Sequence, residues 1–143
     1  MRFVLDASVT LSWLLRDTSS REVAYALAVL NALRTPGATA EVPVTWGLEI
    51  ANVIARGEAK AQITETQSEA FLEMLDAASI QADAATFTHT LSHTLQLARR
   101  YRLSSYDASY LELALRSALP LATLDEDLRR AARKTGVEHF RFA

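Results

Sequence analysis

Two aspartates follow predicted β-strands, at positions where carboxylates could bind a metal ion. Asp6 comes directly after an apolar stretch, and Asp125 comes shortly after Thr123, at the end of another. Ligands of an open parallel sheet bind beyond the carboxyl ends of its strands, so both acids stand where a site would form. Asp is also a favourable helix N-cap, and capping is the favoured interpretation of either acid taken alone.

Glu49 and Asp107 are two further acids in apolar surroundings. Glu49 lies within the apolar segment 46–54, and Asn52 shares its helix face. Asp107 precedes the leucine-rich stretch 111–115. A buried carboxylate is too costly to leave ionised without a partner, so each side chain must reach either solvent or a positive group. Solvent exposure is the simpler explanation of each acid alone, and a cation that prefers oxygen ligands, such as Mg²⁺ or Mn²⁺, is the alternative.

Short strands alternate with helices along the chain, which predicts an α/β fold. Strands are expected over 2–5, 41–44, 79–81, 119–123 and 137–142. Helices are expected over 7–15, 21–33, 45–56 (ended by Gly57), 84–102, 105–117 and 125–134, and another after Thr64, which forms a capping box with Gln67. Such alternation implies right-handed crossovers and a mostly parallel, twisted sheet of about five short strands flanked by helices. We expect one domain over residues 1–143.

The bulk composition is that of a globular protein: half of the residues are hydrophobic and 22% are charged. The absence of cysteine excludes disulfides and thiolate metal sites and agrees with a cytoplasmic location. No apolar stretch approaches the ~20 residues that span a bilayer, and the early Asp6 argues against a signal peptide. The net charge of −2 means that a nucleic-acid substrate would need a local basic patch, a bound metal or a partner subunit.

Two groups of basic residues could supply such a patch, one before Asp107 and one after Asp125. They are Arg99, Arg100 and Arg102, and Arg129, Arg130, Arg133 and Lys134. Either group could bind RNA phosphates, and a solvated helix face explains both equally well.

A histidine pair, His89 and His93, stands at a helical spacing that could bind zinc. No third ligand is evident, and Thr90 stands where the zinc-protease motif has glutamate, so we expect solvent or partner contacts instead.

Four motifs resemble, in order, those of PIN domains, and together they span nearly the whole chain. They are Val4–Ser8, Glu49–Val53, Tyr101–Leu111 and Leu121–Leu128. At this length the sequence is most similar to the VapC-type toxin ribonucleases of VapBC toxin–antitoxin pairs. The resemblance implies a PIN fold and an endoribonuclease that depends on Mg²⁺ or Mn²⁺. It also implies inhibition by a cognate VapB-type antitoxin, and a homodimer or a larger toxin–antitoxin assembly.

The resemblance also assigns roles to residues. Asp6 and Asp107 would be the principal metal ligands, Asp125 would complete the coordination, and Glu49 would hold the metal or its waters. Four neighbours would orient these carboxylates: Ser8, Asn52, Thr123 and Asp127. Asp127 could instead replace or supplement Asp125. The family's mechanism would activate a water and leave a 5′-phosphate and a 3′-hydroxyl.

Several other functions remain as alternatives. A haloacid dehalogenase-like phosphatase needs an acid where Ser8 stands, and a receiver domain needs an acidic pair and a lysine that are not clear here. Within the PIN family, the alternatives are an RNA-processing nuclease that is not a toxin and a non-catalytic module that binds RNA or a partner. A metal-independent binding domain, whose acids serve only as helix caps, is the remaining one.

Overall fold

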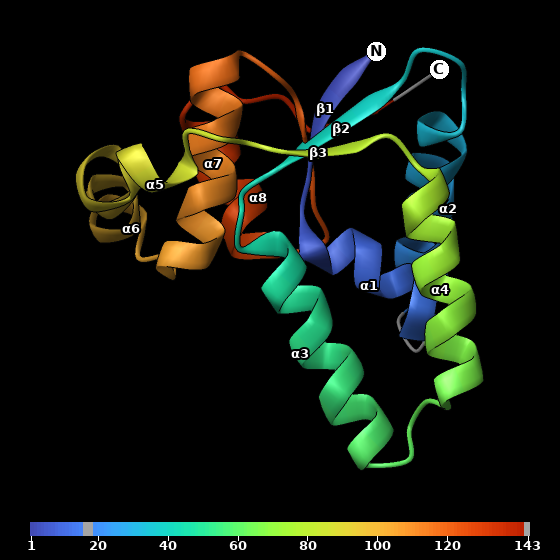
Figure 1. Ribbon diagram of the computed structural model, residues 1–143. Coiled ribbons are helices and arrows are strands. Elements are labelled where there is room, and N and C mark those ends of the chain that lie inside the picture. The colour runs from blue at the N-terminus through green and yellow to red at the C-terminus, as the bar shows by residue number, and fades with distance from the viewer. Residues whose placement is uncertain (16–18, 142–143) are drawn as a thin grey trace.

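The computed structural model describes residues 1–15 and 19–141, whose strands form one parallel sheet at the centre of the molecule (Figure 1). The strands are β1 (Arg2–Leu5), β2 (Thr39–Val42), β3 (Ile80–Ala82) and β4 (Leu121–Ala122). They lie in the order β3-β2-β1-β4, and every neighbouring pair is parallel. The α/β fold class predicted from the sequence is confirmed.

The fifth expected strand, over 137–142, is reduced in the described residues to a single bridge between Leu121 and His139. Leu121 N donates to Glu138 O at 2.9 Å, and Phe140 N donates to Leu121 O at 2.8 Å. Because β4 has only two residues, it offers this segment little length to pair with. Residue 142 lies outside the described residues.

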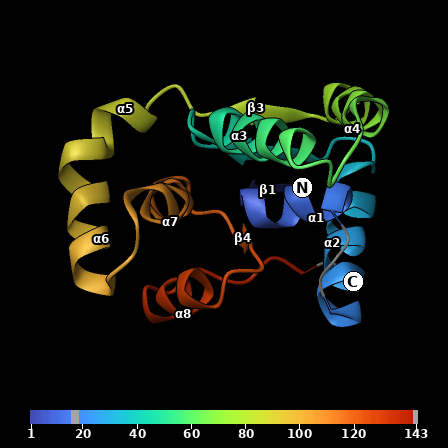
Figure 2. The ribbon, with the colours of Figure 1, turned by 90° about the horizontal axis from the view of Figure 1, so that it is seen from below.

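Helices connect the strands and cover both faces of the sheet (Figure 2). One layer holds α1 (Ala7–Leu15), α2 (Ser20–Leu33) and α4 (Glu65–Ala77). The other holds α5 (Thr86–His89), the π-helix η1 (Thr90–Thr94), α6 (Leu95–Tyr101), α7 (Ser105–Ser117) and α8 (Glu126–Lys134). The remaining helix, α3 (Trp46–Ala59), extends away from the end of β2 (Figure 1). Among the helices of the described residues, none has both the length and the apolar character needed to cross a bilayer.

β1 contributes to hydrophobic cores on both faces, because successive residues of a strand point to opposite sides. Phe3 and Leu5 pack with residues of α1 and α2, whereas Val4 packs with residues of α7 and α8. All three side chains are fully buried. This burial fixes the register of β1 and therefore the position of Asp6, which follows it directly.

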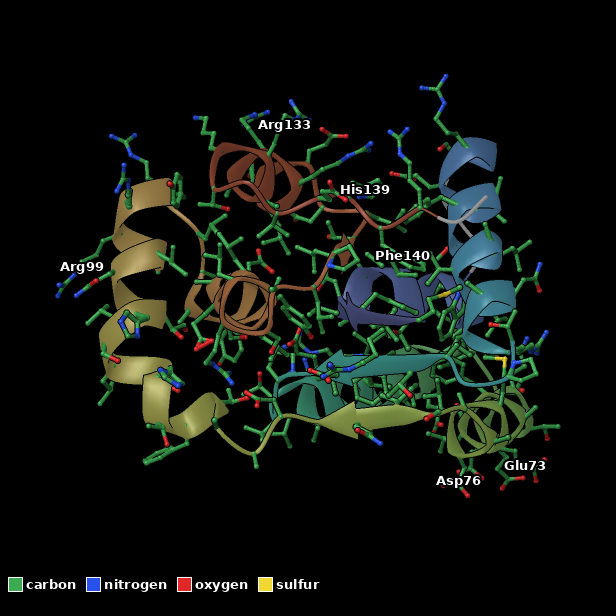
Figure 3. All side chains as sticks on the ribbon, turned by 90° about the horizontal axis from the view of Figure 1, so that it is seen from above. Glu73, Asp76, Arg99, Arg133, His139 and Phe140 are labelled. Carbon is green, nitrogen blue, oxygen red and sulfur yellow. The ribbon has the colours of Figure 1, made fainter. Side chains whose placement is uncertain are left out.

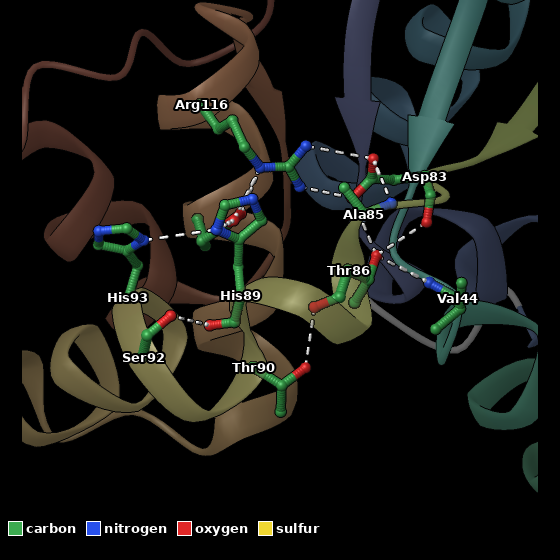
Figure 4. A network of polar contacts seen from close by, with 10 residues as sticks. Val44, Asp83, Ala85, Thr86, His89, Thr90, Ser92, His93 and Arg116 are labelled. Atoms are coloured by element: carbon green, nitrogen blue, oxygen red, sulfur yellow. Dashed lines mark hydrogen bonds and ion pairs between the residues drawn. The ribbon is translucent and has the colours of Figure 1, made fainter.

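The helix expected over 84–102 forms over 86–101, and the π-helix η1 lies in its middle. Two threonine hydroxyls bond to nearby oxygen atoms at this point (Figure 4). Thr90 Oγ1 donates to the Thr86 carbonyl at 2.8 Å, and Thr86 Oγ1 lies 3.0 Å from the Asp83 carboxylate. Side chains that bond locally in this way compete with regular helical hydrogen bonding.

Arg116 of α7 forms ion pairs with Asp83, which lies just before α5, and with Glu112 of its own helix (Figure 4). Its Nε donates to Glu112 at 2.8 Å, and its two terminal nitrogens donate to Asp83 at 3.2 and 2.5 Å. His89 Nδ1 lies 3.7 Å from Glu112 and 3.4 Å from His93 Nδ1. The histidine pair considered for zinc therefore lies beside a glutamate that already binds Arg116.

The helix that carries Glu49 is longer than expected, since α3 continues through Gly57 to Ala59. A Cβ atom at Gly57 would lie 3.0 Å from side-chain atoms of Ile63. Close packing, rather than a helix break, therefore explains this glycine.

Candidate active site

Asp6 lies at the junction of β1 and α1 and is only 3% exposed. Its backbone N–H donates to Ala122 O at 3.0 Å, which holds the end of β1 beside the end of β4. Two hydroxyls donate to the same carboxylate oxygen, Oδ2: Ser8 Oγ at 2.6 Å and Thr123 Oγ1 at 2.7 Å. The other oxygen, Oδ1, takes no part in this pair of bonds. Burial, with a smaller contribution from the charge of Asp125, raises the pKa of Asp6 despite both hydroxyls.

Ser8 and Thr123 also bind the loop between β4 and α8. Ser8 Oγ accepts from Leu124 N at 3.0 Å, and Thr123 Oγ1 accepts from Asp125 N at 3.0 Å. Each hydroxyl therefore donates to Asp6 and accepts from the backbone of this loop. This arrangement fixes the backbone of Asp125 relative to Asp6.

Glu49 lies in the first turn of α3, and its Oε1 accepts a hydrogen bond from the Tyr110 hydroxyl at 2.9 Å. Burial is the main cause that raises the pKa of Glu49 to about 7. The Tyr110 hydrogen bond opposes this rise, whereas the negative charges of Asp6 and Asp107 add to it. Glu49 therefore lies within the electrostatic reach of both aspartates.

Asp107 lies in the first turn of α7, where its backbone N–H donates to Ser104 Oγ, the helix cap, at 3.0 Å. Burial, followed by the charges of Asp6 and Asp125, raises the pKa of Asp107 to about 6. The Ser104 hydroxyl lowers it, and Asp127 adds a smaller increase. Like charges held this close disfavour one another's ionised form.

Asp125 caps α8, since its Oδ1 accepts from Leu128 N at 2.8 Å. Asp125 can therefore cap α8 and also add its negative charge to the surroundings of Asp6 and Asp107. Asp127 is more peripheral: its side chain is 76% exposed and pairs with Arg130 at 3.3 Å. Asn52 is exposed on α3 and has no side-chain hydrogen bond among the described residues.

The structure thus brings four acids from distant parts of the chain into one electrostatic group, which we call the acidic cluster: Asp6, Glu49, Asp107 and Asp125. None of the four forms an ion pair with a cationic side chain of residues 1–15 or 19–141. Such a set of oxygen donors suits a hard divalent cation such as Mg²⁺ or Mn²⁺.

The four acids do not form a compact three-ligand metal site among the described residues. Within the described part of the chain, no three Asp, Glu or His side chains lie close enough to hold one ion. Glu49 is engaged by Tyr110, and Asp125 is engaged in capping α8. Each of these bonds uses one carboxylate oxygen, so Glu49 Oε2 and Asp125 Oδ2 are not engaged by them.

Tyr110 contacts the acidic cluster and was not singled out from the sequence. Its ring is fully buried, and its hydroxyl is the hydrogen-bond donor to Glu49. Burial, together with the charges of Asp6 and Glu49, raises its pKa, so the hydroxyl keeps its proton and remains a donor. Its place beside Asp107 in the third motif is a signal, but its partner is 61 positions away in the sequence.

The basic residues of α8 divide between two cavities. Arg130 and Lys134 line one of about 400 Å³ together with Arg100 and Arg102 of the segment before Asp107. Arg129 and Arg133 line the other, of about 160 Å³, on the side of the C-terminal segment. Arg99 lies on the outer side of α6 and lines neither (Figure 3).

The sequence profile described as "PIN domain" matches residues 3–134. The chain belongs to the PIN domain family. PIN domains are typically metal-dependent nucleases, so both the fold and the acidic cluster agree with this membership.

Solved structures resemble this PIN domain at low sequence identity. PAE2754 from Pyrobaculum aerophilum matches with a TM-score of 0.63 and 20% identity, over 92% of this chain and 87% of that one. FitAcB from Neisseria gonorrhoeae matches with a TM-score of 0.61 and 18% identity, over 99% of this chain and 97% of that one. At these identities the similarity shows a shared fold. No curated protein sequence matches the chain.

Proposed function

We propose that this PIN domain is an endoribonuclease dependent on Mg²⁺ or Mn²⁺, and that it acts as the toxin of a type II toxin–antitoxin pair. The observation that carries the proposal is the acidic cluster, in which burial, with an added contribution from the charge of the buried Asp6, raises the pKa of Glu49 and Asp107. Carboxylates brought together at such cost are typical of functional sites, because the arrangement does not serve stability.

We propose one role for each acid, as the motif resemblance implies. Asp6 and Asp107 would be the principal ligands, with Asp6 held in one orientation by Ser8 and Thr123. Asp125 and Glu49 would complete the coordination, directly or through water. The bound ion would supply an activated water and neutralise charge that develops on the scissile phosphate. Asp127 is exposed and paired with Arg130, which favours Asp125 as the fourth acid.

An antitoxin would suit two features of this surface. A basic side chain inserted at the acidic cluster would neutralise carboxylates that lack a cationic partner among the described residues. A groove of about 880 Å³ runs between α3 and α4, with an apolar floor that includes Trp46, Ile50 and Leu72 and with four acids in the same lining: Glu58, Glu69, Glu73 and Asp76. It lies on the same helix as Glu49 and could hold an apolar segment of a VapB-type partner. We also propose a homodimer, as the motif resemblance implies.

The test is to sequence RNA 5′ ends after brief expression of the wild-type chain and of Asp6→Asn. We expect discrete new 5′ ends in the wild-type sample and none in the Asp6→Asn sample, and co-expression of the antitoxin should remove them. Cleavage that no antitoxin suppresses would favour an RNA-processing PIN nuclease, and no cleavage at all would favour a non-catalytic binding module.

A further inference from the structure

A small cavity of about 160 Å³ lies beside the acidic cluster, between α8 and the segment that follows it. Arg129 and Arg133 line it from α8, and His139 and Arg141 line it from the C-terminal segment. Thr123, whose hydroxyl donates to Asp6, forms part of its wall. Since a water molecule takes up about 30 Å³ of liquid, the cavity has room for an anion of several atoms.

The lining of this cavity is positively charged. It includes three arginines and no aspartate or glutamate. None of the three forms an ion pair with an acid of residues 1–15 or 19–141. In a chain of net charge −2, such a concentration of arginine is local, and a partly enclosed site strengthens its attraction for anions.

His139 adds a buried polar atom without a partner. Its Nδ1 is buried and makes no hydrogen bond within the described part of the chain. Its ring stacks on Tyr25 with centroids 4.7 Å apart. Burial, followed by the positive charges of Arg129 and Arg141, lowers the pKa of His139 to about 4, and an interaction of the ring with the Leu121 backbone opposes this shift only in part. A bound anion would supply the partner and the negative charge that these surroundings lack.

The cavity is not isolated, because it shares four lining residues with a larger one of about 520 Å³: Thr123, Arg129, His139 and Arg141. The larger cavity is also lined by Arg21 and Tyr25 of α2 and by two acids, Glu22 and Glu126. An RNA strand with several phosphates could therefore extend from the small cavity into the larger one. A single phosphate ion would occupy only the small cavity. Arg133 and His139 lie close to each other at this side of α8, far from Arg99 (Figure 3).

We propose that the small cavity binds a backbone phosphate of the RNA strand whose scissile bond lies at the acidic cluster. The proposal rests on the proposed function for the identity of the strand, whereas the anion site itself stands on the cavity. The guanidinium of an arginine can donate two parallel hydrogen bonds to two oxygens of one phosphate, and His139 Nδ1–H would donate to the same phosphate. Thr123 belongs to both sites, so a phosphate held here would set the position of the strand relative to Asp6.

The experiment is an NMR titration of the histidine side chains, which uses Asp107→Asn in EDTA so that no RNA is cut. The chain has three histidines, so His89 and His93 serve as internal references. Inorganic phosphate and a short single-stranded RNA of mixed sequence are added separately. We expect RNA to raise the pKa of His139 by about one unit or more, as an opposite charge at close range does. Arg133→Ala should abolish this rise, and Arg99→Ala, a matched loss of one exposed arginine, should leave it unchanged.

The outcomes separate this proposal from the nuclease proposal. No change at His139 with either anion would overturn the site, and a response to inorganic phosphate alone would overturn the assignment to RNA. If the wild-type protein cuts RNA while His139 never responds, only the phosphate site fails. If His139 responds as expected and RNA is never cut, the site stands and the nuclease proposal fails.

Discussion

At the scale of single residues, Asp6 is the most buried acid of the cluster, and its charge affects the pKa of its neighbours. It is 3% exposed, and the hydroxyls of Ser8 and Thr123 fix one of its oxygens. Its charge contributes to the raised pKa of both Glu49 and Asp107. A buried carboxylate surrounded by others costs stability, so its place at the sheet edge is better explained by binding than by folding.

Asp107→Asn should abolish RNA cleavage, with a loss of at least about a hundredfold, because it removes the charge of a principal ligand. Asparagine has nearly the same size, and the backbone bond to Ser104 remains. The measurement is the rate of cleavage of a labelled RNA at a fixed Mn²⁺ concentration. Asp76→Asn, a matched change of an exposed aspartate on α4, should leave the rate unchanged (Figure 3). Full activity of Asp107→Asn would refute the assigned role.

Thr123→Val should weaken Mn²⁺ binding by about 10- to 100-fold, since a group that orients a metal ligand typically contributes this much. Valine has the shape of threonine but neither donates to Asp6 nor accepts from Asp125 N. Calorimetric titration of Mn²⁺ measures the effect, and Thr123→Ser, which keeps the hydroxyl, should restore most of the affinity. Equal affinities in all three proteins would mean that the hydroxyl does not position Asp6.

The raised pKa of Glu49 predicts that the stability of the metal-free protein depends on pH. Its pKa is about 7 in the folded protein against an ordinary value of 4.5. Between about pH 4.5 and about pH 7 the folded state therefore holds a proton that the unfolded chain has lost. The contribution of Glu49 to stability is present below this interval and is lost as the pH rises through it. His139, with its pKa lowered to about 4, works in the opposite direction, so only a difference between variants isolates Glu49.

In EDTA, Glu49→Gln should therefore melt a few degrees above the wild type at neutral pH and close to it at pH 4.5. Glutamine can still accept from the Tyr110 hydroxyl, which keeps the packing comparable. The check is the melting temperature of both proteins across this range, with Glu73→Gln on the exposed face of α4 as control. A difference that does not grow with pH would contradict the raised pKa.

At the scale of elements, local signals in the sequence predicted the helix starts well. The capping box of Thr64 and Gln67 forms as expected, and Ser104 caps α7. The π-helix η1 was not predictable from periodicity, because it accompanies side-chain bonds of Thr86 and Thr90 rather than a change in the apolar pattern. The same limit hid the bond between Tyr110 and Glu49, since no local pattern reports a contact across the fold.

Arg116→Ala should lower the free energy of unfolding by about 2 kcal/mol, because it leaves the buried carboxylate of Glu112 without its main partner. The Arg116 side chain is itself only 28% exposed, so solvent screens this ion pair only partly. Urea unfolding measures the change.

Two variants serve as controls. Arg116→Lys keeps the positive charge but loses the planar guanidinium, so its free energy of unfolding should lie between those of the wild type and Arg116→Ala. Arg99→Ala should stay within about 0.5 kcal/mol of the wild type, as surface changes do. A loss equal to that of Arg99→Ala would show that the network adds nothing.

At the scale of the whole molecule, the parallel sheet gathers residues that the sequence keeps far apart. The ends of β1 and β4 and the first turns of α3 and α7 supply one acid each. The order of the motifs predicted this set, and the fold explains it, because parallel strands present their carboxyl ends at one edge.

The most direct test of a shared divalent ion is calorimetric titration of Mn²⁺ into the wild-type protein and into Asp6→Asn. We predict one binding process of millimolar or tighter affinity in the wild type and none in the variant. Binding of the same affinity in both proteins would remove Asp6 as a ligand and contradict the account.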